Sequence, residues 1–145
     1  MAEKQYWDER VLSALKGALQ SGDVRIIHEV DELSRKLTAA FPFESTKIDW
    51  RDVPGSLHAH GGHEEFERFF LENATKMGWD TPAYYLSDNA INFAIAGSVK
   101  RLAKHLPVIL ENSQHHYFTA EDFSWCMALT MEGDMDFGFR PEPSA

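Results

Sequence analysis

Cysteine is nearly absent from this sequence, which has Cys126 as its single example in 145 residues. One cysteine can form neither an internal disulfide nor a zinc site built from several cysteines, and such usage is typical of a reducing compartment. There is also no early basic segment followed by an apolar run, and no apolar stretch long enough to span a membrane. We therefore expect a cytoplasmic protein in which Cys126 is buried as a small apolar residue.

Basic side chains are scarce, because 14 Lys and Arg oppose 23 Asp and Glu and the formal net charge is −9. This charge repels the phosphates of nucleic acids and anionic lipids, so neither nucleic acid nor a membrane is expected as a partner. It attracts a basic protein instead and speeds its association. No Lys or Arg occurs between His105 and Phe139, whereas six acidic residues do: Glu111, Glu121, Asp122, Glu132, Asp134 and Asp136.

The common motifs of enzyme chemistry are missing as well. No serine lies in a G-x-S-x-G context, and there is no glycine-rich phosphate loop. One segment, residues 58–65 (HAHGGHEE), has three imidazoles that could share a divalent metal: His58, His60 and His63. It lacks the H-E-x-x-H spacing of helical zinc sites, so we expect no enzyme activity, no cofactor and no native metal site. A metal-dependent or histidine-assisted hydrolase that uses this segment is the alternative.

The length and apolar content fit a single domain over residues 1–145. Apolar residues recur at helical spacing over about residues 8–20 and again from about 23 to 41, where Pro42 ends the pattern. Only a tight turn at Gly22 separates these two helices, which predicts an antiparallel helical hairpin. From about Arg140, two prolines and small residues predict a loose tail.

Further helices are predicted over residues 61–76 and from Ser87 or Asp88 to about Leu106. Strands are predicted around residues 46–50, 83–86, 108–110, 116–118 and 123–131. Bulky residues alternate with small ones in the last of these, so it should be a central strand that lets helices approach. We expect an α+β fold whose N-terminal helical hairpin and further helices pack on a small, mostly antiparallel sheet formed largely by the C-terminal half.

The acidic C-terminal region also carries aromatic residues, and protein interfaces often combine buried aromatic anchors with a charged rim. We expect residues 132–139 (EGDMDFGF) to form a binding loop. The predicted partner-binding residues are Glu121, Asp122, Trp125, Glu132, Asp134, Asp136 and Phe137. The alternative is that the aromatic residues are core and the carboxylates only keep one end of a sheet soluble.

Residues 116–138 (HYFTAEDFSWCMALTMEGDMDFG) resemble the C-terminal segment of small bacterial proteins encoded near polymorphic or contact-dependent toxins. These proteins include suspected immunity proteins. The resemblance implies an antidote that binds a cognate toxin domain and blocks it. Many such toxins are basic nucleases, and a carboxylate-rich surface would mimic the phosphates that they bind. An acidic adaptor or regulatory subunit without a toxin is the remaining alternative.

Overall fold

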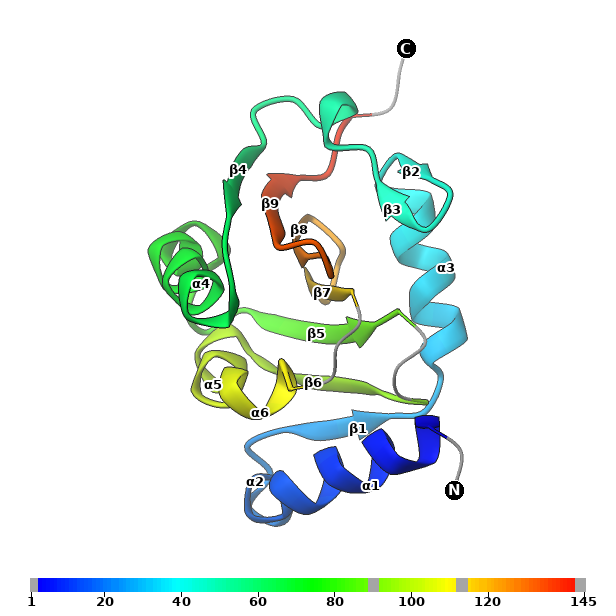
Figure 1. The fold of residues 1–145 in the computed structure, drawn as a ribbon, viewed down its shortest axis with the longest axis vertical. Coiled ribbons are helices and arrows are strands. Elements are labelled where there is room, and N and C mark those ends of the chain that lie inside the picture. The colour runs from blue at the N-terminus through cyan, green and yellow to red at the C-terminus, as the bar shows by residue number, and fades with distance from the viewer. Residues whose placement is uncertain (1–2, 89–91, 112–114, 143–145) are drawn as a thin grey trace.

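The computed structural model describes residues 3–88, 92–111 and 115–142, which adopt an α+β fold (Figure 1). Its main sheet has seven strands in the order β1-β6-β5-β7-β8-β9-β4, and each neighbouring pair is antiparallel. Five of these strands come from residue 82 onward, so the predicted C-terminal sheet is confirmed. The strands are β1 Arg25–Ile27, β4 Leu57–His60, β5 Pro82–Ser87, β6 Ala94–Ser98, β7 His116–Ala120, β8 Trp125–Leu129 and β9 Asp134–Phe139.

Helices cover both faces of the sheet (Figure 1). One face is covered by α1 Glu3–Ala14, α2 Lys16–Ser21, α4 His63–Met77, α5 Val99–Lys104 and α6 Leu106–Ile109. The opposite face is covered by α3 Val30–Ala40, the hairpin of β2 Phe43–Glu44 and β3 Lys47–Ile48, and the short 3-10 helix η1 Trp50–Asp52. In the described ranges, no helix is long and apolar enough to cross a membrane.

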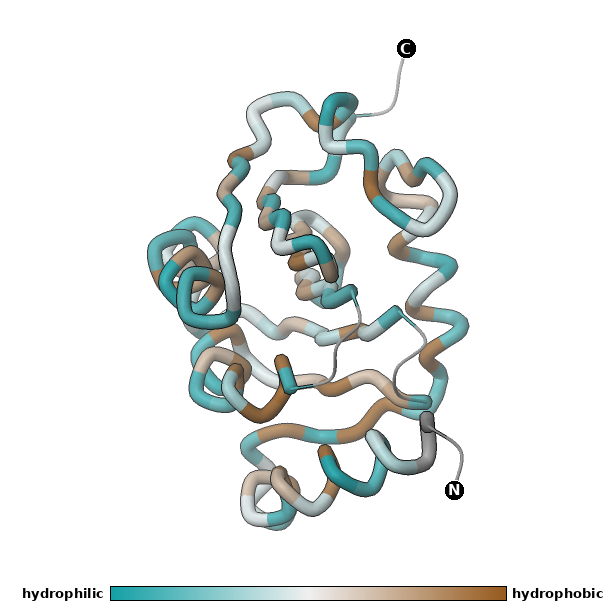
Figure 2. Tube along the Cα trace, viewed as in Figure 1, coloured by the Kyte–Doolittle hydropathy of each residue, from teal (hydrophilic) through white to brown (hydrophobic). Residues whose placement is uncertain are grey.

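The sheet separates two apolar clusters, because successive side chains of a strand point to opposite faces. In β8, Trp125, Met127 and Leu129 join the cluster beneath α4, whereas Cys126 and Ala128 join the cluster beneath α3. Strand β8 lies between β7 and β9, so the prediction of a central strand with one bulky and one small face is confirmed. Helix α3 is amphipathic as well. In Figure 2 its residues change between hydrophilic and hydrophobic from turn to turn, and its buried residues are Leu33 and Leu37.

The predicted N-terminal helical hairpin is not confirmed. Strand β1 lies between α2 and α3 and pairs with the edge of β6 in a register that includes Ile26↔Ile95. The chain therefore passes along the sheet before α3 begins, and α3 packs on the face opposite α1. The sequence did not predict this strand because three residues at the start of an amphipathic segment fit the helical period and the strand period equally well.

The predicted helix from Ser87 or Asp88 to Leu106 is wrong over most of its length. Residues 89–91 lie outside the described ranges, β6 occupies Ala94–Ser98, and only Val99–Lys104 is the helix α5. Three successive residues of β6, Ala94 to Ala96, are buried, because this strand has helices on both sides of the sheet. A strand buried on both faces is apolar throughout, and a helical spacing can be fitted to it.

Other boundaries also changed. The predicted strand at residues 108–110 falls mainly in helix α6, and the strand at 46–50 is reduced to β3, followed by η1. The helix predicted at 61–76 is confirmed as α4, with Phe66, Phe70 and Ala74 fully buried. Residues 140–142 of the predicted tail form neither helix nor strand, and the rest of that tail lies outside the described ranges.

Candidate functional site

The two segments that the sequence singled out lie side by side in the sheet. The sequence predicts a loop at residues 132–139, but they form a turn and then strand β9, whose outer neighbour is β4 from the histidine-rich segment (Figure 1). The register pairs His60 with Asp134 and His58 with Asp136. Sequence reasoning missed both strands because β4 is short and lies before two glycines, and because two carboxylates interrupt the apolar positions of β9.

Strand β8 divides the predicted acidic residues into two groups. Glu121 and Asp122 lie in the turn before β8, whereas Glu132 lies in the turn after it and Asp134 begins β9. Five residues of strand span about 16 Å, so the two groups lie at opposite ends of the sheet. The structure therefore does not bring the predicted carboxylates into one patch.

The two predicted aromatic anchors are core residues. Trp125 and Phe137 are each 2% exposed, and their ring centroids lie 6.3 Å apart in the cluster beneath α4. A partner could reach neither side chain without opening the sheet. The exposed apolar residues nearest the two acidic groups are Phe139, which is 51% exposed, and Met131, which is 61% exposed.

We name residues 130–134, which carry Met131, Glu132 and Asp134, the acidic turn. The turn is closed on itself, because the backbone N–H of Asp134 donates to Oγ1 of Thr130 over 3.1 Å and Gly133 N–H donates to the Thr130 carbonyl over 3.0 Å. Gly133 has φ +89°, a conformation that favours glycine. The sequence EGD therefore specifies a tight turn that leaves the Met131 and Glu132 side chains exposed.

Neighbouring segments hold the acidic turn in place. The Gly61 N–H donates to the Gly133 carbonyl over 3.0 Å, and Nε2 of His60 lies 2.9 Å from the Glu132 carbonyl oxygen. On the other side, the Met131 N–H donates to Nδ1 of His115 over 3.1 Å. A turn fixed by three backbone contacts presents its side chains at defined positions.

Two further acidic residues, Glu65 and Asp88, are linked to the segments that hold the acidic turn. Glu65 packs directly beside Gly61, and Asp88 is tied to the same region because its N–H donates to the His115 carbonyl over 3.0 Å. Lys47 pairs with Glu132 over 3.1 Å, which lowers the pKa of that carboxyl. The ion pairs found among the described residues join neither Glu65 nor Asp134 to a Lys or Arg. Negative charge therefore exceeds positive charge at this end of the sheet.

The opposite end of the sheet is electrically balanced. Glu121 and Asp122 line a hollow of about 550 Å³ together with Phe139 and Lys76. Arg140 Nη1 donates to the Asp122 carbonyl over 3.4 Å, so two bases accompany the two carboxylates. Hydrogen bonding with Ser124 lowers the pKa of Asp122, whose carboxylate accepts the Ser124 N–H at 3.0 Å.

Asp136 is not a surface carboxylate, although the sequence placed it in the binding set. It is 6% exposed, and its Oδ1 lies 2.9 Å from Nδ1 of His58 on the neighbouring strand. Burial raises the pKa of Asp136, while the hydrogen bond with Asp136 raises the pKa of His58. The hydrogen bond between His58 and Asp136 therefore depends on the protonation of both side chains, and it joins the edge strand β4 to β9.

The three imidazoles of the histidine-rich segment are not brought together. His58 and His60 share a face of β4, opposite Asp136 and Asp134. His63 instead begins α4, and its ring packs 6.4 Å from the ring of His116. Within the described part of the chain, no group of three His, Cys, Asp or Glu residues is arranged to hold a metal ion. The described residues therefore show no such cluster for the metal-dependent form of the hydrolase alternative, and the histidine-assisted form stays an alternative.

The fold and this site define an antiparallel α+β protein with one strongly acidic sheet end. Comparison with known protein families and with curated proteins found no match.

Proposed function

We propose that this chain is a binding protein rather than an enzyme, and that it neutralises a basic partner protein that docks on the acidic turn. The partner class that we propose is a cognate toxin domain, with the chain acting as its immunity protein in the bacterial cytoplasm. The resemblance of residues 116–138 to proteins encoded beside toxins supports this class. The adaptor alternative would use the same surface without neutralising its partner.

One observation carries the proposal. Met131 is 61% exposed and directly precedes Glu132 in the acidic turn, which also carries Asp134. An exposed apolar residue with a charged rim is the usual anatomy of a protein interface, in which the rim steers association and the apolar centre slows dissociation. Because the turn is fixed by backbone hydrogen bonds, little conformational entropy would be lost when a partner binds.

The charge balance favours the acidic turn over the hollow beside Phe139, which lies at the other end of β8 and β9. There, Lys76 and Arg140 offset Glu121 and Asp122, so a basic partner would gain less from long-range attraction. The proposed contact set is therefore Met131, Glu132 and Asp134, with Glu65 and Asp88 at its border. Trp125, Phe137 and Asp136 are buried and are not part of this set, and Trp125 lies beside Phe139 at the other end of β8.

Co-purification with the product of the adjacent gene tests the proposal. The full chain and that product are expressed together, and the stoichiometry of any complex is measured by light scattering. The purified chain is then titrated against the partner's toxicity or nuclease activity. We expect a one-to-one complex and loss of activity at one equivalent. A complex that leaves the partner fully active would favour the adaptor alternative, and absence of a complex would contradict the proposal.

A further inference from the structure

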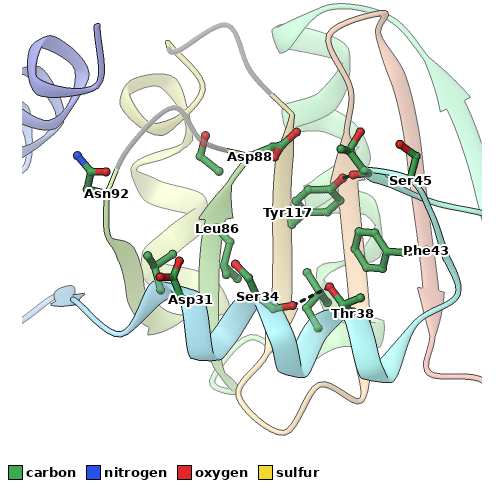
Figure 3. A pocket seen from close by; sticks show the side chains of 13 residues that line it. Asp31, Ser34, Thr38, Phe43, Ser45, Leu86, Asp88, Asn92 and Tyr117 are labelled. Atoms are coloured by element: carbon green, nitrogen blue, oxygen red, sulfur yellow. Dashed lines mark hydrogen bonds between the residues drawn. The ribbon is translucent and has the colours of Figure 1, made fainter. Parts of the chain in front are cut away.

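A hollow of about 240 Å³ opens on the sheet face that carries α3 (Figure 3). It lies between α3, the β2–β3 hairpin and the adjoining ends of β5 and β7. Its floor is apolar and deeply buried, with Leu37 3%, Leu86 2% and Tyr117 6% exposed. Phe43 adds a second aromatic wall, and its ring centroid lies 5.9 Å from that of Tyr117. We name this site the α3 pocket.

The α3 pocket is held open by hydrogen bonds. Tyr117 Oη donates to the Thr46 carbonyl over 2.9 Å, which fastens the β2–β3 hairpin beside the pocket floor. Thr38 Oγ1 donates to the Ser34 carbonyl over 2.8 Å, so this hydroxyl stays on its own helix (Figure 3). Burial raises the pKa of Tyr117, so the phenol remains a neutral donor at physiological pH. These contacts form the pocket before any partner arrives.

The mouth of the α3 pocket is polar and acidic. Figure 3 shows Asp31 on α3 and Asp88 at the end of β5 on different sides of the mouth. None of the described residues that line the pocket is Lys, Arg or His. The mouth also adjoins the acidic turn, because His115 binds the backbone of both Asp88 and Met131. The pocket and the acidic turn can therefore contact the same partner.

We infer that the α3 pocket receives one apolar side chain from a Lys- or Arg-bearing segment of the protein bound at the acidic turn. The inference rests on the proposed function for the identity of that protein. A volume of about 240 Å³ is below the roughly 300 Å³ at which small-molecule pockets begin, so a single Leu, Met or Phe side chain suits it better than a cofactor does. An apolar anchor in a preformed pocket with a polar rim is typical of an interface hot spot. The mouth carboxylates select basic flanking residues.

Filling the pocket provides the first test. Ser34→Phe places a ring at the pocket wall, whereas Ala39→Phe adds the same ring at an exposed position of α3 that does not line the pocket. With the full chain and the adjacent gene's product, Ser34→Phe should raise the dissociation rate constant at least about tenfold. Ala39→Phe should leave that constant unchanged, and the melting temperatures of both variants confirm that they fold.

A titration without the partner provides the second test. Methyl resonances of Leu37 and Leu86 are followed by NMR while acetyl-Lys-Leu-Lys-amide or acetyl-Glu-Leu-Glu-amide is added to the full chain. We expect the lysine peptide to shift these methyl resonances and the Ser34→Phe substitution to abolish that effect. The glutamate peptide should cause much smaller shifts.

The outcomes separate the two proposals. If the complex forms and Ser34→Phe dissociates at the wild-type rate, the pocket inference is overturned while the proposed function stands. If no complex forms, the proposed function fails, and the peptide titration alone decides the pocket. Equal or absent shifts with the two peptides would overturn the inference in either case.

Discussion

His58 and Asp136 face each other across β4 and β9, with Nδ1 of the imidazole 2.9 Å from Oδ1 of the carboxylate. The carboxylate is buried, while most of the imidazole is exposed. The pair therefore joins the edge strand β4 to its neighbour β9. Strand β4 leads directly into the Gly61 contact with the acidic turn. The His58–Asp136 pair therefore helps to position the surface on which the proposed function depends.

This pair predicts a pH-dependent stability. Because Asp136 raises the pKa of His58, the charged imidazole stabilises the fold. That contribution is fully present below the ordinary histidine pKa of about 6.5 and is lost as the pH rises through the folded-state pKa. The free energy of unfolding of the wild type, relative to His58→Gln, should therefore decrease over this interval in denaturant titrations. An advantage that grows with pH would contradict the assignment.

NMR titration of the His58 ring gives a separate check on the same pair. We expect Asp136→Asn to lower the pKa of His58 more than Asp134→Asn does, because the hydrogen bond to Asp136 is the largest cause of the shift and Asp134 acts only at longer range. Equal effects of the two variants would mean that general negative charge, rather than the hydrogen bond, raises the pKa.

Gly138 should not tolerate a side chain. A Cβ there would lie 2.7 Å from Cγ1 of Val53 and 3.2 Å from Cζ3 of Trp50. We expect Gly138→Ala to lower the free energy of unfolding by about 1–3 kcal/mol through overpacking. Gly17 lies in α2, where an added Cβ would meet no atom within 4 Å, so Gly17→Ala should instead stabilise by about 0.5–1 kcal/mol. Urea denaturation of both variants tests the opposite signs.

The two apolar clusters predict additive energetics across the sheet. Leu15, in the cluster beneath α4, is 1% exposed, and Leu37, in the cluster beneath α3, is 3% exposed. Each substitution to Ala should cost about 2–5 kcal/mol, and the double variant should equal the sum within about 0.5 kcal/mol. Leu12→Ala, at a 37% exposed position of α1, serves as a control with little effect. A large coupling between Leu15 and Leu37 would favour the helical hairpin that the structure lacks.

The thiol of Cys126 should be unreactive in the folded protein. Its side chain is fully buried, and burial alone raises the pKa of the thiol. A thiol-specific reagent should therefore fail to modify it at neutral pH until denaturant is added. Cys126→Ser should destabilise more than Cys126→Ala, because a hydroxyl without a partner costs about 1–3 kcal/mol in an apolar cluster. Rapid modification of the native protein would contradict the burial.

Amphipathic elements could be predicted from the sequence, and elements defined by pairing could not. Helix α4 was predictable because Phe66, Phe70 and Ala74 share one face and the charged residues occupy the others. Strand β6 was not, because its apolar residues are buried on both sides and only hydrogen bonds with β1 and β5 distinguish it from a helix. For β9 the sequence predicts a loop, because Asp136, which its residue type marks as exposed, is buried against His58.

The candidate site was predictable in composition but not in geometry. The sequence singles out Glu132 and Asp134, yet joins them to Glu121 and Asp122 at the other end of β8. The strand predicted over residues 123–131 also includes Met131 among its alternating bulky residues, whereas β8 ends at Leu129 and Met131 is exposed. Glu65 and Asp88 approach the acidic turn only through tertiary contacts, which leave no local signal.

Paired charge reversals test the central claim most directly. Glu132→Lys with Asp134→Lys changes the acidic turn, and Glu121→Lys with Asp122→Lys changes the other end by the same net charge. Association rate constants with the adjacent gene's product are measured at low salt for folded variants of equal melting temperature. We predict that the first pair slows association by about tenfold or more, while the second pair stays near the wild-type rate. Equal slowing by both pairs, or a larger effect from the second, would contradict binding at the acidic turn.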